Sequence, residues 1–275
     1  RYTRLFFTYL ILFIVMAAII YPLLWTVGAS FNPGNSLVST TLIPENPTLD
    51  HYRELFEGRK NLPYVQWYMN SMKISFFTMI LTVISVSFTG YAFSRFRFKG
   101  RKNGLTLFLL LQMIPQFSAL IALYVLAQML GLMNSHWLLI VLYTGGQIPM
   151  NTYLMKGYMD SIAIDLDESA RMDGAGPTRI FFQIIMPLAK PMIAVVAMNG
   201  FTGPLGDFVL SSVILRNTES YTLPIGLFNL VNDVQGGSYT TFAAGAILIS
   251  IPVAIIFVLL QKNFVAGLTA GGTKG

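Results

Sequence analysis

The chain has 275 residues, of which 54% are hydrophobic and only 11% are charged, and its mean hydropathy is +0.61. This composition excludes an ordinary soluble globular domain and predicts an all-α, polytopic integral membrane protein, because lipid offers the backbone no hydrogen-bond partner outside a helix. The net charge of +6 fits basic loops that face anionic lipid, so lipid is an expected partner and nucleic acid is not.

Six segments are apolar over about 20 residues, the length that crosses a hydrocarbon core of about 30 Å. The fourth is the least apolar, because glycine, proline and amide side chains interrupt it at Gly145, Gln147, Pro149 and Asn151. In chain order the predicted spans are Leu5–Ala29, Tyr68–Phe93, Leu105–Leu130, Trp137–Tyr158, Pro191–Leu215 and Thr240–Lys262.

The placement of lysine and arginine favours keeping all six spans. With six spans, most of the 18 basic residues lie on the same side as both termini, and the positive-inside rule makes that side cytoplasmic. The chain is then a single transmembrane domain, 1–275, in the cytoplasmic membrane of a prokaryote. Its predicted parts outside the membrane are external loops 30–67 and 216–239, a cytoplasmic loop 159–190 and a cytoplasmic tail 263–275.

Catalytic and cofactor-binding patterns are missing from the sequence. His51 and His136 stand apart from other metal-ligating residues and are expected at the surface, and there is no cysteine for a thiolate site. No glycine-rich phosphate loop is present, so any ATP and Mg²⁺ would be bound by another subunit. The chain is therefore expected to have no catalytic, cofactor or metal residues and not to be an enzyme.

One cytoplasmic segment is unlike the rest of the chain. Three carboxylates, at Asp165, Asp167 and Glu168, crowd the start of a predicted helix that Asp165 is expected to cap. Gly174 suits a left-handed backbone at the end of this helix, and Pro177 suits the first position of the next one. The segment Asp165–Pro177, called the elbow below, is thus predicted to be a helix–turn–helix with a small, acidic exposed face.

The elbow and its continuation resemble the EAA motif, EAA–x3–G–x9–I–x–L–P, of permease subunits in binding-protein-dependent ABC importers. The matching stretches are Glu168-Ser169-Ala170, Gly174 and Ile184-Ile185-Met186-Pro187, with Ser and Met as the two departures. The resemblance implies that the elbow is a coupling helix seated in a cleft of an ATPase subunit. The coupling residues it implies are Glu168, Ser169, Ala170, Asp173, Gly174, Ile184 and Pro187.

Two further stretches narrow the resemblance to carbohydrate-type permeases. Pro44–Tyr52 is similar to a segment of their first external loop, where Thr48 can cap a short helix lying on the membrane surface. The tail resembles the C-terminus of the smaller maltose/maltodextrin permease subunit, which implies that it inserts between two ATPase subunits. Its matching residues are Gly267, Leu268, Thr269, Gly271, Gly272 and Lys274.

Polar residues inside the spans are candidates for a substrate path. Asn199-Gly200 and Thr202–Pro204 are expected to break the fifth span near the middle of the membrane, with Asn199 facing a cavity. Gln112 in the third span and Asp207 further out are the other candidates. Hydrogen bonding between helices is the alternative explanation for all three residues.

The resemblance implies a non-enzymatic permease subunit of an ATP-driven sugar importer, with maltose or maltodextrin as the expected cargo. The partners it implies are a second permease subunit, two ATPase subunits and an extracytoplasmic sugar-binding protein, into whose cleft loop 216–239 would reach. Alternatives are a permease for another carbohydrate or polyol, an ion-coupled secondary carrier, and a scaffold that moves no solute.

Overall fold

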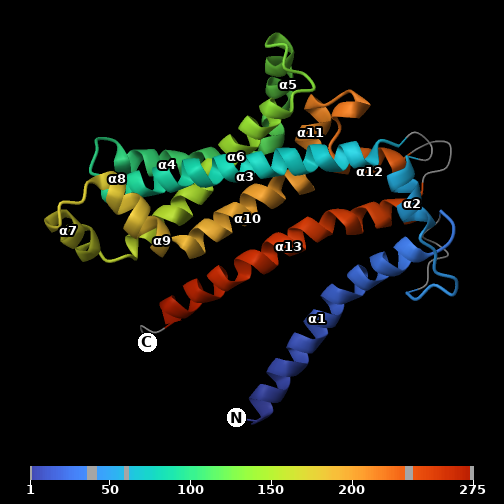
Figure 1. The fold of residues 1–275 in the computed structure, drawn as a ribbon, viewed down its shortest axis with the longest axis horizontal. Helices are drawn as coiled ribbons and strands as arrows, with labels where there is room; N and C mark the ends of the chain where they lie inside the picture. The colour runs from blue at the N-terminus through green and yellow to red at the C-terminus, as the bar shows by residue number, and fades with distance from the viewer. Residues whose placement is uncertain (1, 36–41, 59–61, 233–237, 273–275) are drawn as a thin grey trace. The chain divides into compact units, whose positions relative to one another are not determined.

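The computed structural model describes residues 2–35, 42–58, 62–232 and 238–272, and every regular element within these ranges is a helix (Figure 1). The all-α prediction is thereby confirmed for the described residues. The helices are α1 (Tyr2–Phe31), α2 (Asp50–Glu57), α3 (Tyr64–Arg95), α4 (Arg101–Gln112), α5 (Leu120–Met129), α6 (His136–Asp160), α7 (Asp165–Met172), α8 (Pro177–Ile180), α9 (Met186–Leu188), α10 (Lys190–Gly206), α11 (Val209–Ile214), α12 (Leu223–Val231) and α13 (Tyr239–Gly272).

The chain divides into two compact units. The first holds residues 1–68 and 223–251, and the second holds residues 69–222 and 252–275. Helices α3 and α13 each contribute one end to the first unit and the other end to the second. The single transmembrane domain expected from the sequence stays a prediction.

In the first unit, His51 joins three segments that are distant in sequence. Its ring is 5% exposed, with Nε2 2.8 Å from the carbonyl oxygen of Asn32 and Nδ1 3.1 Å from the Thr241 hydroxyl. The surface position expected for His51 is therefore wrong. The histidine instead ties α2 to the end of α1 and the start of α13, because both ring nitrogens find polar partners there.

Trp67 is a second buried side chain in this unit. Its side chain is 4% exposed and lies directly over Gly226 of α12, where a Cβ atom would come within 2.0 Å of the indole. Only glycine permits this contact without displacing α12 or the ring. Thr48 is not the N-cap of α2, because Leu49 takes that position without a side-chain bond. The Thr48 hydroxyl still accepts the N–H of Asp50, the first residue of α2.

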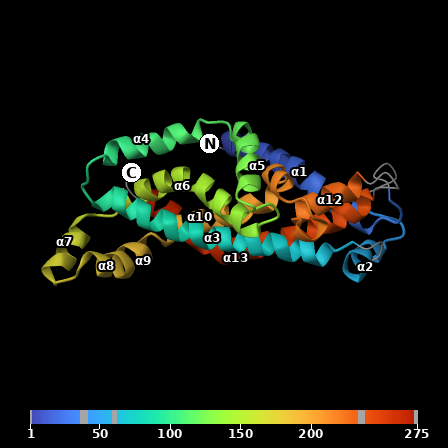
Figure 2. The same ribbon diagram turned by 90° about the horizontal axis from the view of Figure 1, so that it is seen from above.

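In the second unit, α6 lies between α4 and α10, as Figure 2 shows. Two glycines bring helices into close contact here. A Cβ on Gly200 of α10 would lie 2.8 Å from the Cα atom of Met79 in α3, and one on Gly90 of α3 would lie 2.6 Å from the Met155 side chain of α6. Small residues at helix crossings are typical of membrane proteins, where packing replaces the hydrophobic effect between helices.

Three helices are long and apolar enough to cross a membrane: α1, α3 and Tyr239–Asn263 of α13. A fourth candidate is the bent pair Pro177–Leu188 and Lys190–Gly206, whose two parts meet at 80°. This supports a multi-pass membrane protein, while the number of six spans and the cytoplasmic position of both termini remain predictions.

Two further predicted spans, Trp137–Tyr158 and Leu105–Leu130, have different outcomes in the structure. The least apolar one, Trp137–Tyr158, lies within α6, a continuous helix of 25 residues, or about 37 Å. Leu105–Leu130 is not one helix, because α4 ends at Gln112 and a 3₁₀ turn at Gln116–Ala119 leads into α5. Pro115 explains this break, since it lacks an N–H and disfavours a helical backbone at the residue before it.

The predicted break in the fifth span is also misplaced. Helix α10 runs without interruption through Asn199, Gly200 and Pro204, and it ends at Gly206. The chain then turns at Asp207 and Phe208 before α11 begins. Gly200 has a packing role in α10, because it allows the close approach of α3.

Candidate functional site

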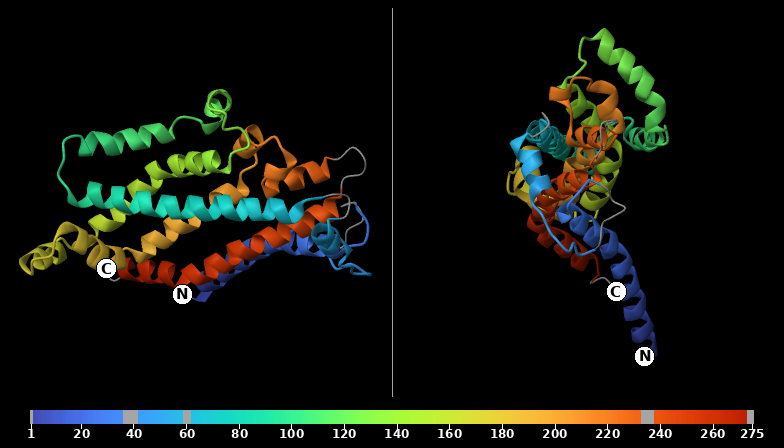
Figure 3. Two further views of the ribbon diagram at one scale, coloured as in Figure 1. Left: turned by 45° about the horizontal axis from the view of Figure 1, so that its top comes forward. Right: turned by 90° about the vertical axis from the view of Figure 1, so that its right-hand side faces the viewer.

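The elbow lies at the end of the second unit where α3 ends, and it forms the helix–turn–helix that the sequence predicts (Figure 3). Gly174 has φ +78°, and its N–H donates to the carbonyl of Arg171 at 3.0 Å. The N–H of Ala175 donates to the carbonyl of Ala170 at 2.9 Å. These two bonds are the Schellman pattern that satisfies the last carbonyls of a helix, and they require the left-handed residue at Gly174.

The motif residues divide between the surface and the interior. Glu168, Ser169, Asp173 and Gly174 are exposed, whereas Ala170 is buried. The exposed face also carries apolar side chains, with Met172 the most exposed at 89%. A surface that combines apolar and acidic groups in this way suits a protein partner better than bulk water.

The expected N-cap at Asp165 is wrong. Ile164 occupies the cap position without a side-chain hydrogen bond, and Asp165 is the first residue of α7. Asp167 also departs from expectation, because it is buried at 1% exposure rather than part of the acidic surface.

A helical arm leads from the elbow to α10. It consists of α8, a π-helical turn at Phe181–Ile185 and α9, with Pro187 exposed and Ile184 half-buried. Ile180, Phe181 and Ile184 repeat at i, i+1 and i+4, a spacing that predicts an apolar stripe on the arm. The structure confirms it, since Ile180 and Phe181 are buried in a cluster with residues of α3 and α6. Movement of the elbow would therefore be resisted by a packed core and not by backbone alone.

The tail continues α13 as a helix through Gly272. Gly267, Leu268, Thr269, Gly271 and Gly272 thus lie on its last turns, and Lys274 lies outside the described residues.

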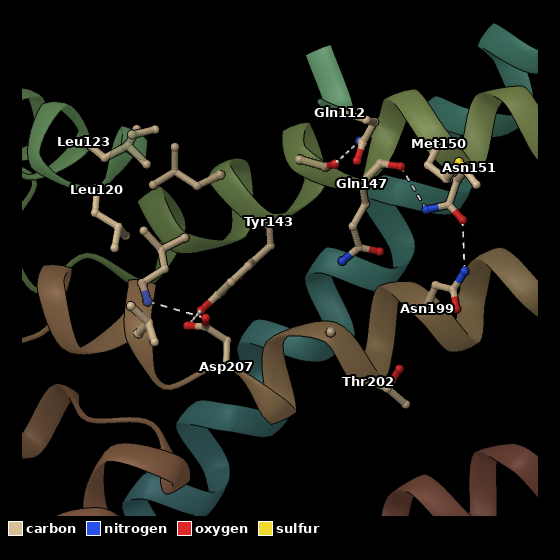
Figure 4. A pocket seen from close by; sticks show the side chains of 16 residues that line it. Gln112, Leu120, Leu123, Tyr143, Gln147, Met150, Asn151, Asn199, Thr202 and Asp207 are labelled. Atoms are coloured by element: carbon tan, nitrogen blue, oxygen red, sulfur yellow. Dashed lines mark hydrogen bonds between the residues drawn. The ribbon is translucent and has the colours of Figure 1, made fainter. Parts of the chain in front are cut away.

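A cavity of about 580 Å³, with both apolar and polar lining residues, lies in the second unit between α4, α5, α6, α10 and α11 (Figure 4). All three predicted path residues line it: Gln112, Asn199 and Asp207. Gln112 donates to the carbonyl of Gly146 at 3.1 Å, and Asn199 donates to Oδ1 of Asn151 at 3.1 Å. The structure thus brings the predicted residues together, and it also gives each of the three a hydrogen-bond partner on α6.

Asp207 is the path residue whose side chain makes the most hydrogen bonds. Its Oδ2 accepts the Tyr143 hydroxyl at 2.7 Å and the N–H of Ser211 at 2.9 Å. These bonds hold the carboxylate at the start of α11, where it satisfies a free backbone donor. Its role in this geometry is to connect α6, α10 and α11.

Gln147 is a cavity residue that sequence reasoning missed. Its amide nitrogen lies over Gly203, where a Cβ atom would be 3.0 Å away, and its Oε1 is buried without a hydrogen-bond partner among the described residues. Asn151, 4% exposed, is the other missed residue, and it joins Asn199 to the Gln147 carbonyl. The sequence feature that could have identified both residues is the cluster of amide side chains in the fourth predicted span.

The chemistry of the cavity is that of neutral hydrogen bonding. Its lining holds amides, a phenol and a threonine hydroxyl, one carboxylate that is already engaged, and no lysine or arginine. Nowhere in the described ranges do three or more His, Asp or Glu residues gather as a metal ion would need. The site can therefore bind hydroxyl-rich ligands but provides no charge to hold an anion.

Comparison with known proteins adds three similarities. Residues 87–269 match the family described as "Binding-protein-dependent transport system inner membrane component". The chain is 77% identical over 275 residues to the galactooligosaccharides transport system permease protein GanQ of Bacillus subtilis (strain 168), covering 100% of this chain and 97% of that protein. It is 47% identical over 268 residues to the maltodextrin transport system permease protein MdxG of the same strain, covering 98% and 95%.

Among solved structures, a bacterial ABC transporter involved in the import of the acidic polysaccharide alginate has a chain with the same fold. The TM-score is 0.76 at 22% identity, and the match covers 96% of this chain and 98% of that one.

Proposed function

The chain belongs to the family of binding-protein-dependent transport system inner membrane components, and we propose that its cargo is a neutral galacto-oligosaccharide. As a member of this family it is a membrane-spanning permease of a bacterial ABC sugar importer, located in the inner membrane. The observation that carries the cargo proposal is 77% identity, along the whole chain, to a galactooligosaccharide permease.

The cavity supports a neutral sugar. Amide and hydroxyl groups match the hydroxyls of an uncharged oligosaccharide, whereas an acidic polysaccharide would need cations that the lining lacks. Maltose or maltodextrin, the cargo expected from the sequence, is the second candidate, and the 47% identical maltodextrin permease supports it.

The energy source in this proposal lies in partner subunits. Two ATPase subunits bind ATP and Mg²⁺ and hold the exposed faces of Glu168 and Ser169 in a cleft, while a second permease subunit and an extracytoplasmic sugar-binding protein complete the importer. The six-span topology with a cytoplasmic elbow belongs to the same proposal, because the ATPase subunits act on that side of the membrane. The exposed, partly apolar surface of α7 supports this arrangement.

The cargo is tested by uptake into cells that lack this chain and are complemented with it. We expect ATP-dependent import of radiolabelled galactobiose to depend on the chain, and import of maltotriose to be slower. Faster import of maltotriose would shift the assignment to the second candidate, and uptake that follows an ion gradient without ATP would contradict the importer.

The same uptake assay tests whether the cavity touches the sugar. In Gln147→Met the buried Oε1 is replaced by an apolar group of similar length, so one hydrogen bond to the sugar is lost and we expect half-maximal import to need about three- to tenfold more sugar. Asn199→Leu is the matched variant, because it leaves the Oδ1 atom of Asn151 without its donor and should reduce the amount of folded protein. An unchanged concentration dependence in Gln147→Met would remove the cavity from the path.

A further inference from the structure

The last two turns of α3 present one stripe of side chains to the elbow and its arm. Phe88, Tyr91 and Arg95 stand at positions i, i+3 and i+7, which share a face of an α-helix. Phe88 stacks on Phe181 with ring centroids 4.9 Å apart, and the Tyr91 ring lies at the same distance from Phe181. The arm is therefore packed against α3, a helix to which it is not adjacent in sequence.

Arg95 forms the polar end of this stripe. Its Nε lies 2.8 Å from Oδ2 of Asp167, and the two side chains are only 4% and 2% exposed. Its Nη2 also donates to the carbonyl of Ile162 at 3.0 Å, in the link between α6 and α7. One guanidinium thus holds both the first turn of α7 and the segment that leads into it.

The Arg95–Asp167 contact is an ion pair by distance, although its N–H is not aligned for a hydrogen bond. Neither carboxylate oxygen of Asp167 accepts a hydrogen bond within the described part of the chain. The arginine charge therefore offsets the burial of this carboxylate, and separating the two groups would leave an uncompensated charge. Such a pair resists sliding of α7 along α3.

We propose that Arg95 is a positioning residue that locks the elbow to α3, so that displacement of the elbow by an ATPase subunit moves α3 directly. Without this lock, force from α7 would pass through α6 and the arm, which flank the elbow in sequence, and would reach α3 through the ring contacts of the arm. The proposal rests on the importer function proposed above, and it adds a third route into the bundle. Because α3 contacts α10 at Gly200 and α6 at Met155, movement of α3 reaches the helices that line the cavity.

The test uses the complete importer in proteoliposomes, with its partner permease, ATPase subunits and sugar-binding protein. The quantity measured is galactobiose imported per ATP hydrolysed. We expect Arg95→Gln and Asp167→Asn each to lower this ratio at least about fivefold while the ATPase subunits still co-purify, since coupling energies of a few kcal/mol correspond to such factors. Arg53→Gln is the control, because it removes an exposed arginine and its ion pair with Asp50 in the first unit.

If the ratio of import to ATP hydrolysis stays within fivefold of wild type in both variants, the proposal is overturned. This holds even if import and hydrolysis both fall, because a parallel fall is what the loss of a purely stabilising ion pair would cause. Failure of the importer function itself would appear differently, as a wild-type complex without ATP-dependent galactobiose import. If the wild-type complex carries maltotriose, the same ratio is measured with maltotriose.

A double variant is used if the single-substitution variants do not assemble with the other importer subunits. The chain has no cysteine, so Arg95→Cys/Asp167→Cys can be bridged with a short bis-thiosulfonate reagent when the other subunits are also free of cysteine. Bridging restores a fixed link between α3 and α7, and we expect it to raise the ratio at least about fivefold over the unbridged protein. No rise, or a fall, contradicts a rigid lock.

Discussion

Gly174→Val will abolish sugar import while the chain still inserts and folds. The residue has φ +78°, and its N–H takes part in the bonds that end α7. A non-glycine residue in this conformation costs about 1–2 kcal/mol, and a β-branched side chain costs more. Because about 1.4 kcal/mol shifts an equilibrium tenfold, the elbow will leave its observed shape and import will fall by more than about tenfold.

Gly176 supplies the matched control. It lies two residues further on with φ −75°, and a Cβ atom at either glycine would meet nothing within 4 Å. Gly176→Ala should therefore import at the wild-type rate, whereas Gly174→Ala should be impaired and Gly174→Val inactive. Expression and co-purification of the ATPase are measured beside import. Normal import by Gly174→Val would contradict the role of the elbow.

Gly200→Val will prevent stable folding of the second unit. A Cβ atom at this position would lie 2.8 Å from the Cα atom of Met79, and backbone cannot move aside as a flexible side chain can. The crossing of α10 and α3 must open, and overpacking of this kind typically costs about 1–3 kcal/mol or more. We expect a lower midpoint of thermal unfolding in detergent and little monodisperse protein.

Gly145→Val separates this steric effect from the helix preference of the substituted residue. Gly145 is also helical, but a Cβ atom there would meet nothing within 4 Å. The same substitution should leave the unfolding midpoint close to wild type. Equal loss of folded protein in both variants would show that the close approach at Gly200 is not what limits packing.

The elbow was predictable because its determinants are local. Gly174 and Pro177 each impose a backbone conformation on their own position, so their spacing predicts where α7 ends and α8 begins. The apolar stripe of the arm follows from periodicity in the same way. Matching of Glu168 to Pro187 with a family motif then identified the class of protein.

Features that depend on distant contacts were missed. His51 was expected at the surface, yet Thr241, 190 positions away, is one of the partners that bury it. The contact of Trp67 with Gly226, 159 positions away, also has no local signal in the sequence. The break at Asp207 was placed several residues early, because Gly200 serves the close approach of α3 and does not interrupt α10. Tertiary packing overrides local preference at such positions.

The cargo was predictable only to its class. Motifs that match carbohydrate permeases describe coupling and topology, which different sugar importers share, so maltodextrin was the expected cargo. Identity along the whole chain favours a galacto-oligosaccharide instead. Gln147 and Asn151, which line the cavity proposed to contact the sugar, lie in the least apolar of the predicted spans.

The measurement that tests the central claim most directly is crosslinking from the elbow in native membranes. Ser169 is exposed on α7, and the chain is free of cysteine, so Ser169→Cys carries a single photo-reactive label. Glu45→Cys, exposed in the predicted external loop, carries the same label as control. We predict an adduct between residue 169 and a nucleotide-binding ATPase subunit, and no such adduct from residue 45. Well-labelled protein that gives no ATPase adduct from residue 169, or gives one from residue 45, would contradict the coupling role and the topology.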